Sequence, residues 1–330
     1  MRSPKSRATP RGGPGTGGGK RGEFAAIERV RRRLPGPPPG QVWIGDDAAV
    51  LGAVSGPLVV TTDVAVAGVH ADLEVIGLDD LGWRAFAGAV SDVAAMGARP
   101  LGAVIAVAGP PTTDLDLLYD GIAGASQAHG CPVVGGDLSN STELAVTVTV
   151  VGRIEDGPGP VLRSGARAGD RLYVTGPLGA AAAGLRALRA PSGRGDRSEA
   201  GSEEASMVAH RRPWARLAEG EMARRAGATA MIDVSDGLVA DLGHLAEASG
   251  VGFRLDTVPV APGATIDDAL GGGEDYELVM AVPDSTRIEA AFAAAGLRPL
   301  LAIGVCSADP AERTLAGRPT TGLGWQHSWG

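Results

Sequence analysis

Residues 89–96 read Ala-Val-Ser-Asp-Val-Ala-Ala-Met, a run of small apolar side chains in which Ser91 and Asp92 are the only polar ones. Apolar residues recur at intervals of three and four from Leu78 to Met96, and Gly97 follows as a stop signal. The spacing therefore predicts a largely buried helix over 78–96. A carboxylate on such a helix is costly to bury unless it is paired or metal-bound, and a solvated helix face is the alternative interpretation.

Strands and helices alternate on both sides of this helix. Before it, we expect a helix over 23–33 and strands over 42–44 and 58–62. After it, we expect strands over 101–107, 132–134, 144–152, 171–175, 252–255 and 277–282, and helices over 115–129, 178–190, 214–226 and 239–249. A loop over 154–169 divides the pattern. The predicted fold class is α/β or α+β, with domains over 22–155 and 156–330.

Composition excludes several classes of protein. No apolar run approaches the ~18 residues that span a bilayer, so we expect no membrane partner. Cys131 and Cys306 stand alone, without a second cysteine or a histidine at ligand spacing. The sequence therefore predicts neither a disulfide framework nor a zinc site, and a cytoplasmic location.

The charge is unevenly distributed along the chain. The net charge is −8, but residues 1–21 hold six basic side chains and no acid, so the remaining residues carry −14. An acidic body argues against nucleic-acid binding. The basic segment could be a transit peptide or an RNA-contacting arm, but its Gly and Pro content favours a disordered tail. Residues 191–206, rich in Gly, Ser and charge, are predicted to form a solvated polar loop.

The body of the chain has no lysine, because Lys5 and Lys20 are the only two. A Walker A loop needs a lysine after glycine, and a protein-kinase lobe needs one on a strand. Both classes are therefore excluded. If the protein handles nucleotide phosphates, metal ions and arginines must neutralise them.

Aspartates follow apolar runs at four places, at Asp47, Asp63, Asp137 and the pair Asp233 and Asp236. Each is flanked by Gly, Ser or Thr, as expected where a strand ends. Carboxylates at strand ends can converge on one point, and Mg²⁺ prefers such oxygen ligands. The alternative is that Asp and Gly simply mark turns at these places.

Three further patterns are weaker. Residues 175–179, TGPLG, open a predicted helix and could bind an anion with their amides. Residues 271–278, GGGEDYEL, combine glycines that allow close approach of a ligand with neighbouring acids. His70 follows one of the proposed metal turns and could meet a phosphate, although a lone histidine is more often structural.

Seven motifs occur in an order known from one enzyme family. They are GDDAAV (45–50), TTDVAVAGVH (61–70), SDVAAMGARP (91–100), VVGGD (133–137), RSGARAGDRLYVTG (163–176), IDVSDGL (232–238) and GGGEDYEL (271–278). The chain resembles the thiamine-monophosphate kinases, within the superfamily of aminoimidazole ribonucleotide synthetase and selenophosphate synthetase. The resemblance covers residues 22–330 except 191–206.

The resemblance implies a two-domain subunit whose N-terminal sheet pairs across a homodimer, with the active site in the interdomain cleft. It places the ligands of several Mg²⁺ ions at Asp47, Thr61, Thr62, Asp63, Asp92, Asp137, Asp233 and Asp236. It places the ATP contacts at Gly136, Arg163 and Ser235. It places the contacts to thiamine monophosphate at His70, Glu274 and Trp325.

The implied activity is ATP-dependent phosphorylation of thiamine monophosphate to thiamine diphosphate, in thiamine diphosphate biosynthesis. The acceptor phosphate is mostly ionised at neutral pH, since its second pKa is about 6, so we expect no general base or covalent nucleophile. One alternative is another superfamily enzyme, which activates an amide or a selenide; a selenide enzyme would need a reactive Cys near its N-terminus, which is missing. A metal- or nucleotide-binding regulator without turnover also stays open.

Overall fold

The computed structural model describes residues 19–45, 48–190, 200–320 and 322–325. Most of the predicted tail and the predicted metal ligand Asp47 lie outside these ranges. Helix α1 (Gly19–Arg31) already begins within the range predicted as tail. No helix in the described ranges is both long and apolar enough to cross a bilayer.

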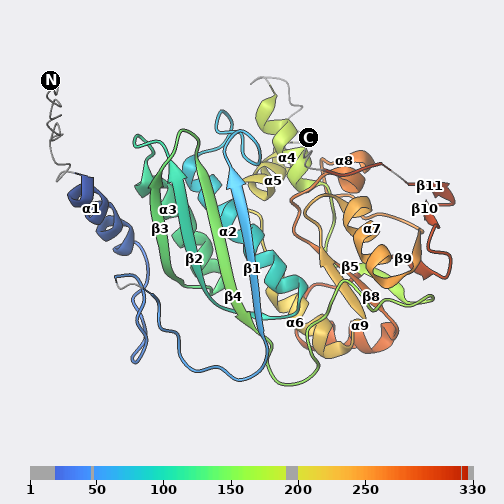
Figure 1. The fold of residues 1–330 in the computed structure, drawn as a ribbon. Helices are drawn as coiled ribbons and strands as arrows, with labels where there is room; N and C mark the ends of the chain where they lie inside the picture. Colours follow the sequence, from blue (N-terminus) through green and yellow to red (C-terminus); the bar gives the residue numbers. More distant parts are fainter. Residues whose placement is uncertain (1–18, 46–47, 191–199, 321, 326–330) are drawn as a thin grey trace, which may run out of the picture.

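The N-terminal half is a four-stranded sheet backed by two helices (Figure 1). The strand order is β1-β4-β2-β3, with β2 and β3 parallel and the other pairs antiparallel. The elements are β1 (Leu58–Val66), α2 (Leu78–Ala95), β2 (Arg99–Gly109), α3 (Leu115–His129), β3 (Val133–Asn140) and β4 (Ala145–Arg153). The predicted strand over 42–44 is reduced to an isolated bridge between Val42 and Val50.

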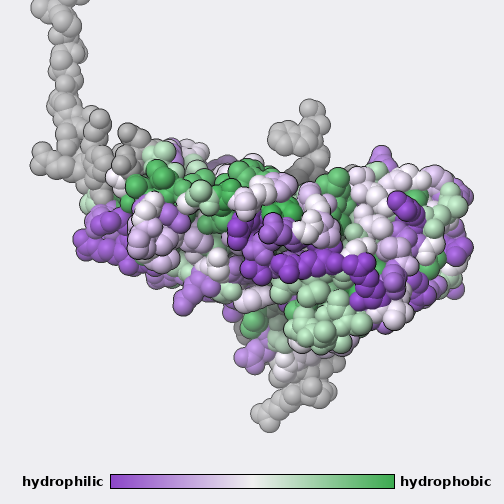
Figure 2. All heavy atoms as spheres, turned by 90° about the horizontal axis from the view of Figure 1, so that it is seen from below, coloured by the Kyte–Doolittle hydropathy of each residue, from purple (hydrophilic) through white to green (hydrophobic). Residues whose placement is uncertain are grey.

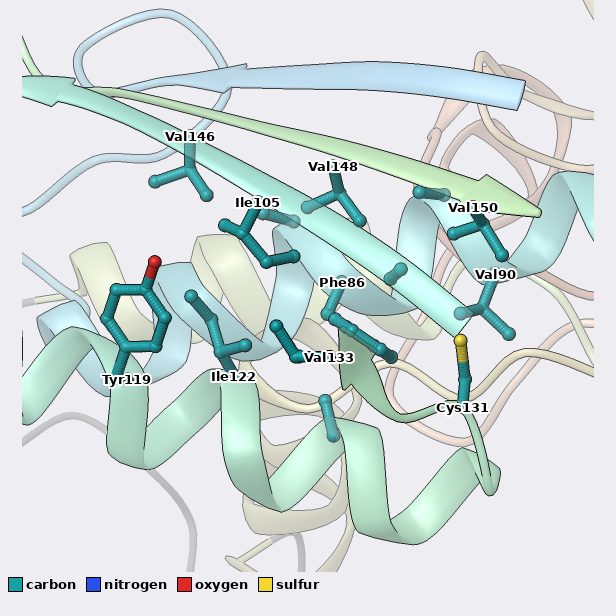
Figure 3. Close-up of a cluster of buried hydrophobic side chains, with 14 of the residues drawn as sticks. Phe86, Val90, Ile105, Tyr119, Ile122, Cys131, Val133, Val146, Val148 and Val150 are labelled. Carbon is teal, nitrogen blue, oxygen red and sulfur yellow. The ribbon is translucent and has the colours of Figure 1, made fainter. Parts of the chain in front are cut away.

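Alternation along the strands builds the first core. In β4, every second residue is buried, and Val148 packs with Ile105 of β2 against Phe86 of α2 and Ile122 of α3 (Figure 3). These four side chains are fully buried. Each such burial contributes about 1.5–3 kcal/mol, which holds α2 firmly against the sheet.

The C-terminal half is a seven-stranded mixed sheet in the order β11-β10-β7-β9-β5-β8-β6. Its strands are β5 (Arg171–Val174), β6 (Ala230–Asp233), β7 (Gly252–Leu255), β8 (Leu278–Val282), β9 (Leu301–Ser307), β10 (Arg313–Leu315) and β11 (Arg318–Pro319). Its helices are α4 (Ala180–Arg189), α5 (Ala200–Arg211), α6 (Leu217–Ala226), α7 (Leu238–Ser249), α8 (Ile266–Gly271) and α9 (Ser285–Ala294). Two sheets and their helices confirm the mixed α/β class.

Both faces of the C-terminal sheet are covered. Ile232 of β6 packs in the cluster on the α7 side, and its neighbour Met231 packs in the cluster on the side of α6 and α9. The second cluster also contains Ala94 and Ala95 from α2. Helix α2 therefore lies at the junction of the two halves, which places Asp92 there.

Part of the predicted polar loop is helical. The loop prediction over 191–206 is wrong for residues 200–206, which belong to α5. The chain there is poor in apolar residues, but α5 packs closely on α4, where a Cβ at Gly184 would overlap the backbone of Ser206. Close packing of the two helices overrides the local composition. Residues 191–199 lie outside the described ranges.

One face of the N-terminal sheet is exposed and apolar. Three valines lie on this face, and their side chains are 65% (Val60), 42% (Val64) and 39% (Val104) exposed. The strand register places them on the same face, because each pairs with a residue on one face of β4: Val60 with Val151, Val64 with Thr147 and Val104 with Thr149. Figure 2 shows hydrophobic surface gathered over this half of the molecule. Large apolar patches of this kind are typical of interaction surfaces.

Candidate active site

A cavity of about 560 Å³ is lined by residues of both halves of the chain. The N-terminal half contributes Asp63 of β1, the turn after this strand and one face of α2. Asp63 lies inside β1, because the strand continues to Val66 and does not end at residue 62 as predicted. The C-terminal half contributes α4, α5, the loop after β6 and the segment before β8. The predicted site residues that line the cavity are Asp63, His70, Asp92, Asp233, Ser235, Asp236, Glu274 and Trp325.

The register of β1 decides which of its polar side chains face the cavity. Thr61 and Asp63 lie on the α2 side, and the Thr61 hydroxyl donates to Oδ2 of Asp92 at 2.5 Å. Burial raises the pKa of Asp92, and burial together with the nearby charge of Asp92 raises the pKa of Asp63. Gly88 leaves the necessary room, because a Cβ there would lie 3.1 Å from Oδ2 of Asp63.

Asp233, at the end of β6, meets this pair from the other half. It is 3% exposed and accepts a hydrogen bond from the Ser91 hydroxyl at 2.7 Å. Burial, followed by the charge of Asp92, raises its pKa to about 7. Arg163 opposes this effect, since its charge lowers the pKa of both Asp92 and Asp233. The carboxylates therefore repel one another, and a cation between them would relieve that repulsion.

The donor chemistry of this cluster suits Mg²⁺. In the ranges described, no three His, Cys, Asp or Glu side chains form a complete metal site by themselves. A complete protein cage is not required, because Mg²⁺ in phosphoryl-transfer sites is usually held by one or two carboxylates together with water and phosphate oxygens. Asp63, Asp92 and Asp233 offer hard oxygen donors of this type.

The remaining cavity residues suit an organic phosphate. Nδ1 of His70 accepts the amide hydrogen of Val66 at 3.0 Å, so the neutral ring carries its proton on Nε2. Glu274 forms an ion pair with Arg84, whose side chain is 4% exposed. Glu274 and Tyr276 have φ values of 69° and 49°. Positive φ at residues other than glycine is strained, and such strain often accompanies ligand-binding sites.

Five predicted site residues in the described ranges are not among those that line this cavity: Thr61, Thr62, Gly136, Asp137 and Arg163. Asp137 and Gly136 of β3 line a second cavity, of about 830 Å³, at the opposite edge of the sheet. Thr62 lies on the outer face, with its hydroxyl 2.9 Å from that of Thr149. The charge of Arg163 lowers the pKa of Asp92 and of Asp233, although Arg163 does not line the cavity.

The TGPLG turn cannot serve as the anion site considered from the sequence. A carboxylate already occupies the N-terminus of α4, where Asp275 accepts the amide hydrogens of Gly179 at 2.5 Å and Ala181 at 3.0 Å. Asp275 is therefore a structural cap. It is an acid of the GGGEDYEL motif that points away from the cavity's ligand space.

Comparison with known proteins places the chain in a family. Residues 45–154 match the AIR synthase related protein N-terminal domain, and residues 167–315 match the corresponding C-terminal domain. A thiamine-monophosphate kinase of Mycobacterium tuberculosis is 39% identical over 276 residues, covering 78% of this chain and 80% of the relative. The chain belongs to the thiamine-monophosphate kinase family.

Solved structures of the thiamine-monophosphate kinase family share the fold. The enzyme from Stenotrophomonas maltophilia K279a aligns with a TM-score of 0.74 and 33% identity, over 90% of this chain and 98% of that one. AaThiL complexed with AMPPCP and TMP aligns with a TM-score of 0.73 and 32% identity, over 93% and 97% of the two chains. The resemblance inferred from the seven motifs is confirmed.

The structure adds residues to the site of this family member that sequence reasoning missed. Arg84 on α2 donates to the carbonyl of His70 and pairs with Glu274. The hydroxyl of Tyr276 lies close to Asp63, since both would contact a Cβ at Gly88. Asp241 in the first turn of α7 binds the loop after β6. Of these three residues, only Arg84 could have been noticed in the sequence, because it is a charged residue inside the predicted apolar helix over 78–96.

Proposed function

We propose that this chain transfers the γ-phosphoryl group of ATP to the phosphate of thiamine monophosphate, forming thiamine diphosphate and ADP. Membership of the thiamine-monophosphate kinase family supports this reaction. The observation that carries it is the convergence of Asp63, Asp92 and Asp233 with His70 and Glu274 in one cavity. Such a cavity offers carboxylates for metal-bound phosphates beside groups for an organic substrate.

The chemistry requires two anions to approach each other. The acceptor oxygen is already ionised at neutral pH, so no side chain needs to remove a proton. Asp63, Asp92, Asp233 and Asp236 would hold Mg²⁺, which when bound neutralises phosphate charge and aligns the phosphates for in-line transfer. Ser235 and Arg163 would contact ATP from the C-terminal half.

The substrate would occupy the side of the cavity near Trp325. His70 would donate from Nε2 to the substrate phosphate. The thiazolium ring is cationic, and Glu274 offers it a carboxylate while Trp325 offers an aromatic face. The phosphate end of thiamine monophosphate then has a hydrogen-bond donor, and the cationic end has a carboxylate and an aromatic face.

A homodimer would account for the residues that this cavity leaves out. Asp63 and Asp137 lie at opposite edges of the sheet, three strand spacings or about 14 Å apart, so they cannot bind one ion within a single chain. Pairing the exposed sheet faces of two copies into a barrel would bring Asp137 of the partner subunit toward Asp63. Thr62 and Gly136 would then also border the site.

The reducing cytoplasm is the proposed compartment. Both cysteines are free and buried, which suits a location where thiols stay reduced.

A product assay tests the proposed reaction. Purified protein with ATP and Mg²⁺ is incubated with thiamine monophosphate, with thiamine or with neither, and the products are separated by chromatography. We expect thiamine diphosphate and stoichiometric ADP from thiamine monophosphate only. Thiamine presents a hydroxyl that needs general-base help, worth ~10²–10⁴ in rate, and the proposed mechanism assigns none of the described side chains to that role. Comparable turnover of thiamine would refute the mechanism, and no turnover would refute the function.

A further inference from the structure

One buried carboxylate organises the loop between β6 and α7. Oδ2 of Asp241 accepts hydrogen bonds from the backbone amides of Ser235, Asp236 and Gly237, each at 3.0 Å. Asp241 is 2% exposed and is not among the residues that line the cavity. Three successive amides that converge on one oxygen fix the orientation of the peptide groups between them.

The carbonyls of the same loop hold two segments from elsewhere in the chain. The carbonyl of Ser235 accepts the amide hydrogen of Glu274 at 2.9 Å, and that of Asp236 accepts the amide hydrogen of Trp325 at 3.0 Å. In a planar trans peptide, the N–H and the preceding C=O point in opposite directions. The amides that turn inward to Asp241 therefore turn these two carbonyls outward, toward Glu274 and Trp325.

We propose that Asp241 is a positioning residue of the active site, acting through these two peptide groups on both substrates at once. On one side of the loop, Asp241 fixes the backbone positions of Ser235 and Asp236. On the other side, the carbonyls of the loop fix the backbone positions of Glu274 and Trp325. The inference rests on the proposed function, because it takes Ser235 and Asp236 as the ATP and metal side and Glu274 and Trp325 as the thiamine side.

Without the carboxylate, one buried amide and two partly buried amides would lose a charge-assisted acceptor. The loop would then rotate its peptides toward other acceptors, and both carbonyls would move away from the segments that they hold. Displacement of a positioning group by about 1 Å can reduce the rate ~10²-fold, even far from the reacting atoms.

A purely structural role is the competing interpretation, since Asp241 also lies in the first turn of α7. Asp170 supplies a matched control for that role. It is 5% exposed, and its Oδ2 accepts the Arg167 amide at 3.0 Å and the Thr229 hydroxyl at 2.6 Å. Asp170 belongs to the same half of the chain but is not part of the cavity wall.

The test compares Asp241→Asn with Asp170→Asn in the full chain, well below their melting temperatures. Both variants lose a buried charge and should melt earlier than the wild type. We expect Asp241→Asn to raise KM for ATP and for thiamine monophosphate and to lower kcat/KM for each by ~10–100-fold. Asp170→Asn should keep both kcat/KM values within about twofold of the wild type.

Four outcomes separate the inference from the proposed function. Folded Asp241→Asn with wild-type kcat/KM for both substrates overturns the inference. An inactive wild-type protein refutes the proposed function instead, and is recognised before any variant is made.

If Asp241→Asn does not fold, Asp241→Glu is tested in its place. This variant keeps the charge but lengthens the side chain, and we expect the same kinetic shifts from it. Wild-type kinetic constants for Asp241→Glu overturn the inference. Hydrogen exchange on the wild type needs no variant, and rapid exchange at amides 235–237 also overturns it.

Discussion

The hydroxyl of Ser91 lies 2.7 Å from Oδ2 of Asp233, so a single hydrogen bond joins α2 of the N-terminal half to β6 of the C-terminal half. Ser91 is fully buried, and Asp233 is 3% exposed. Because the bond stabilises the ionised carboxylate, it opposes the burial that raises the pKa of Asp233. A hydrogen bond between the two halves therefore lies within the acidic cluster of Asp63, Asp92 and Asp233.

Ser91→Ala should weaken both the fold and the activity. Loss of a buried hydrogen bond to a charged group costs about 1.5–3 kcal/mol, measurable as a lower urea midpoint. The pKa of Asp233 should rise further, so the activity should require a higher pH or more Mg²⁺ than in the wild type. An unchanged Mg²⁺ activation curve would show that Asp233 does not depend on Ser91.

Loss of charge at the acidic cluster should abolish most turnover. Asp63→Asn and Asp233→Asn should each lose at least ~100-fold in kcat, as is typical when preorganised charge stabilisation is removed. Asp267→Asn is the matched control, because Asp267 is an exposed acid on α8. Near-normal kcat in both cluster variants would remove these residues from the site.

A charge on the exposed sheet face should dissociate the proposed dimer. Val60→Lys places a cation on a side chain of the edge strand β1 that is 65% exposed on the apolar face, where dimerisation would bury it. We expect a monomer by light scattering, with activity reduced by an order of magnitude or more. Val208→Lys, on α5 and 54% exposed, should leave the mass unchanged. If Val60→Lys has wild-type mass, the dimer uses another surface or does not form.

His210 should contribute a loss of stability in mild acid. Burial, followed by the charge of Arg84, lowers its pKa to about 3. Between pH 3 and 6.5 the unfolded chain therefore binds a proton that the folded chain does not, and stability decreases as the pH falls. From pH 7.5 to 5.5 this group should cost about 1.4 kcal/mol. His210→Asn keeps an acceptor near Arg84 and should lack this loss; parallel unfolding curves for the two proteins would contradict the assignment.

Both thiols should be inert in the folded protein. Burial raises the pKa of Cys131 and of Cys306 to about 12, with Asp170 adding to the effect at Cys306. Because the thiolate is the reactive form, native protein at pH 8 should show almost no labelling by a disulfide reagent. In denaturant both thiols should react. Rapid labelling of native protein would show that one of the two sites opens.

Much of the site was predictable because its chemistry is local in sequence. The aspartates beside Gly, Ser and Thr predicted a magnesium site, and the lack of lysine in the body excluded a Walker A loop and a protein-kinase lobe. The phosphotransferase activity came from the resemblance carried by the seven motifs. The small apolar residues of 78–96 predicted a buried helix, and α2 occupies Leu78–Ala95. These signals depend only on which residue types stand beside one another.

Only the tertiary structure decided which of those residues face the cavity. Thr61 and Thr62 are equivalent in sequence, but successive strand residues point to opposite faces, and the packing of α2 selects Thr61. Asp63 and Asp137 follow similar patterns, yet the strand order puts them at opposite edges of the sheet. Asp241 gave no signal, because its role arises from three amides that meet only in the folded loop. Sequence patterns specify the chemistry of side chains, whereas the strand order and packing that set their distances depend on contacts between remote segments.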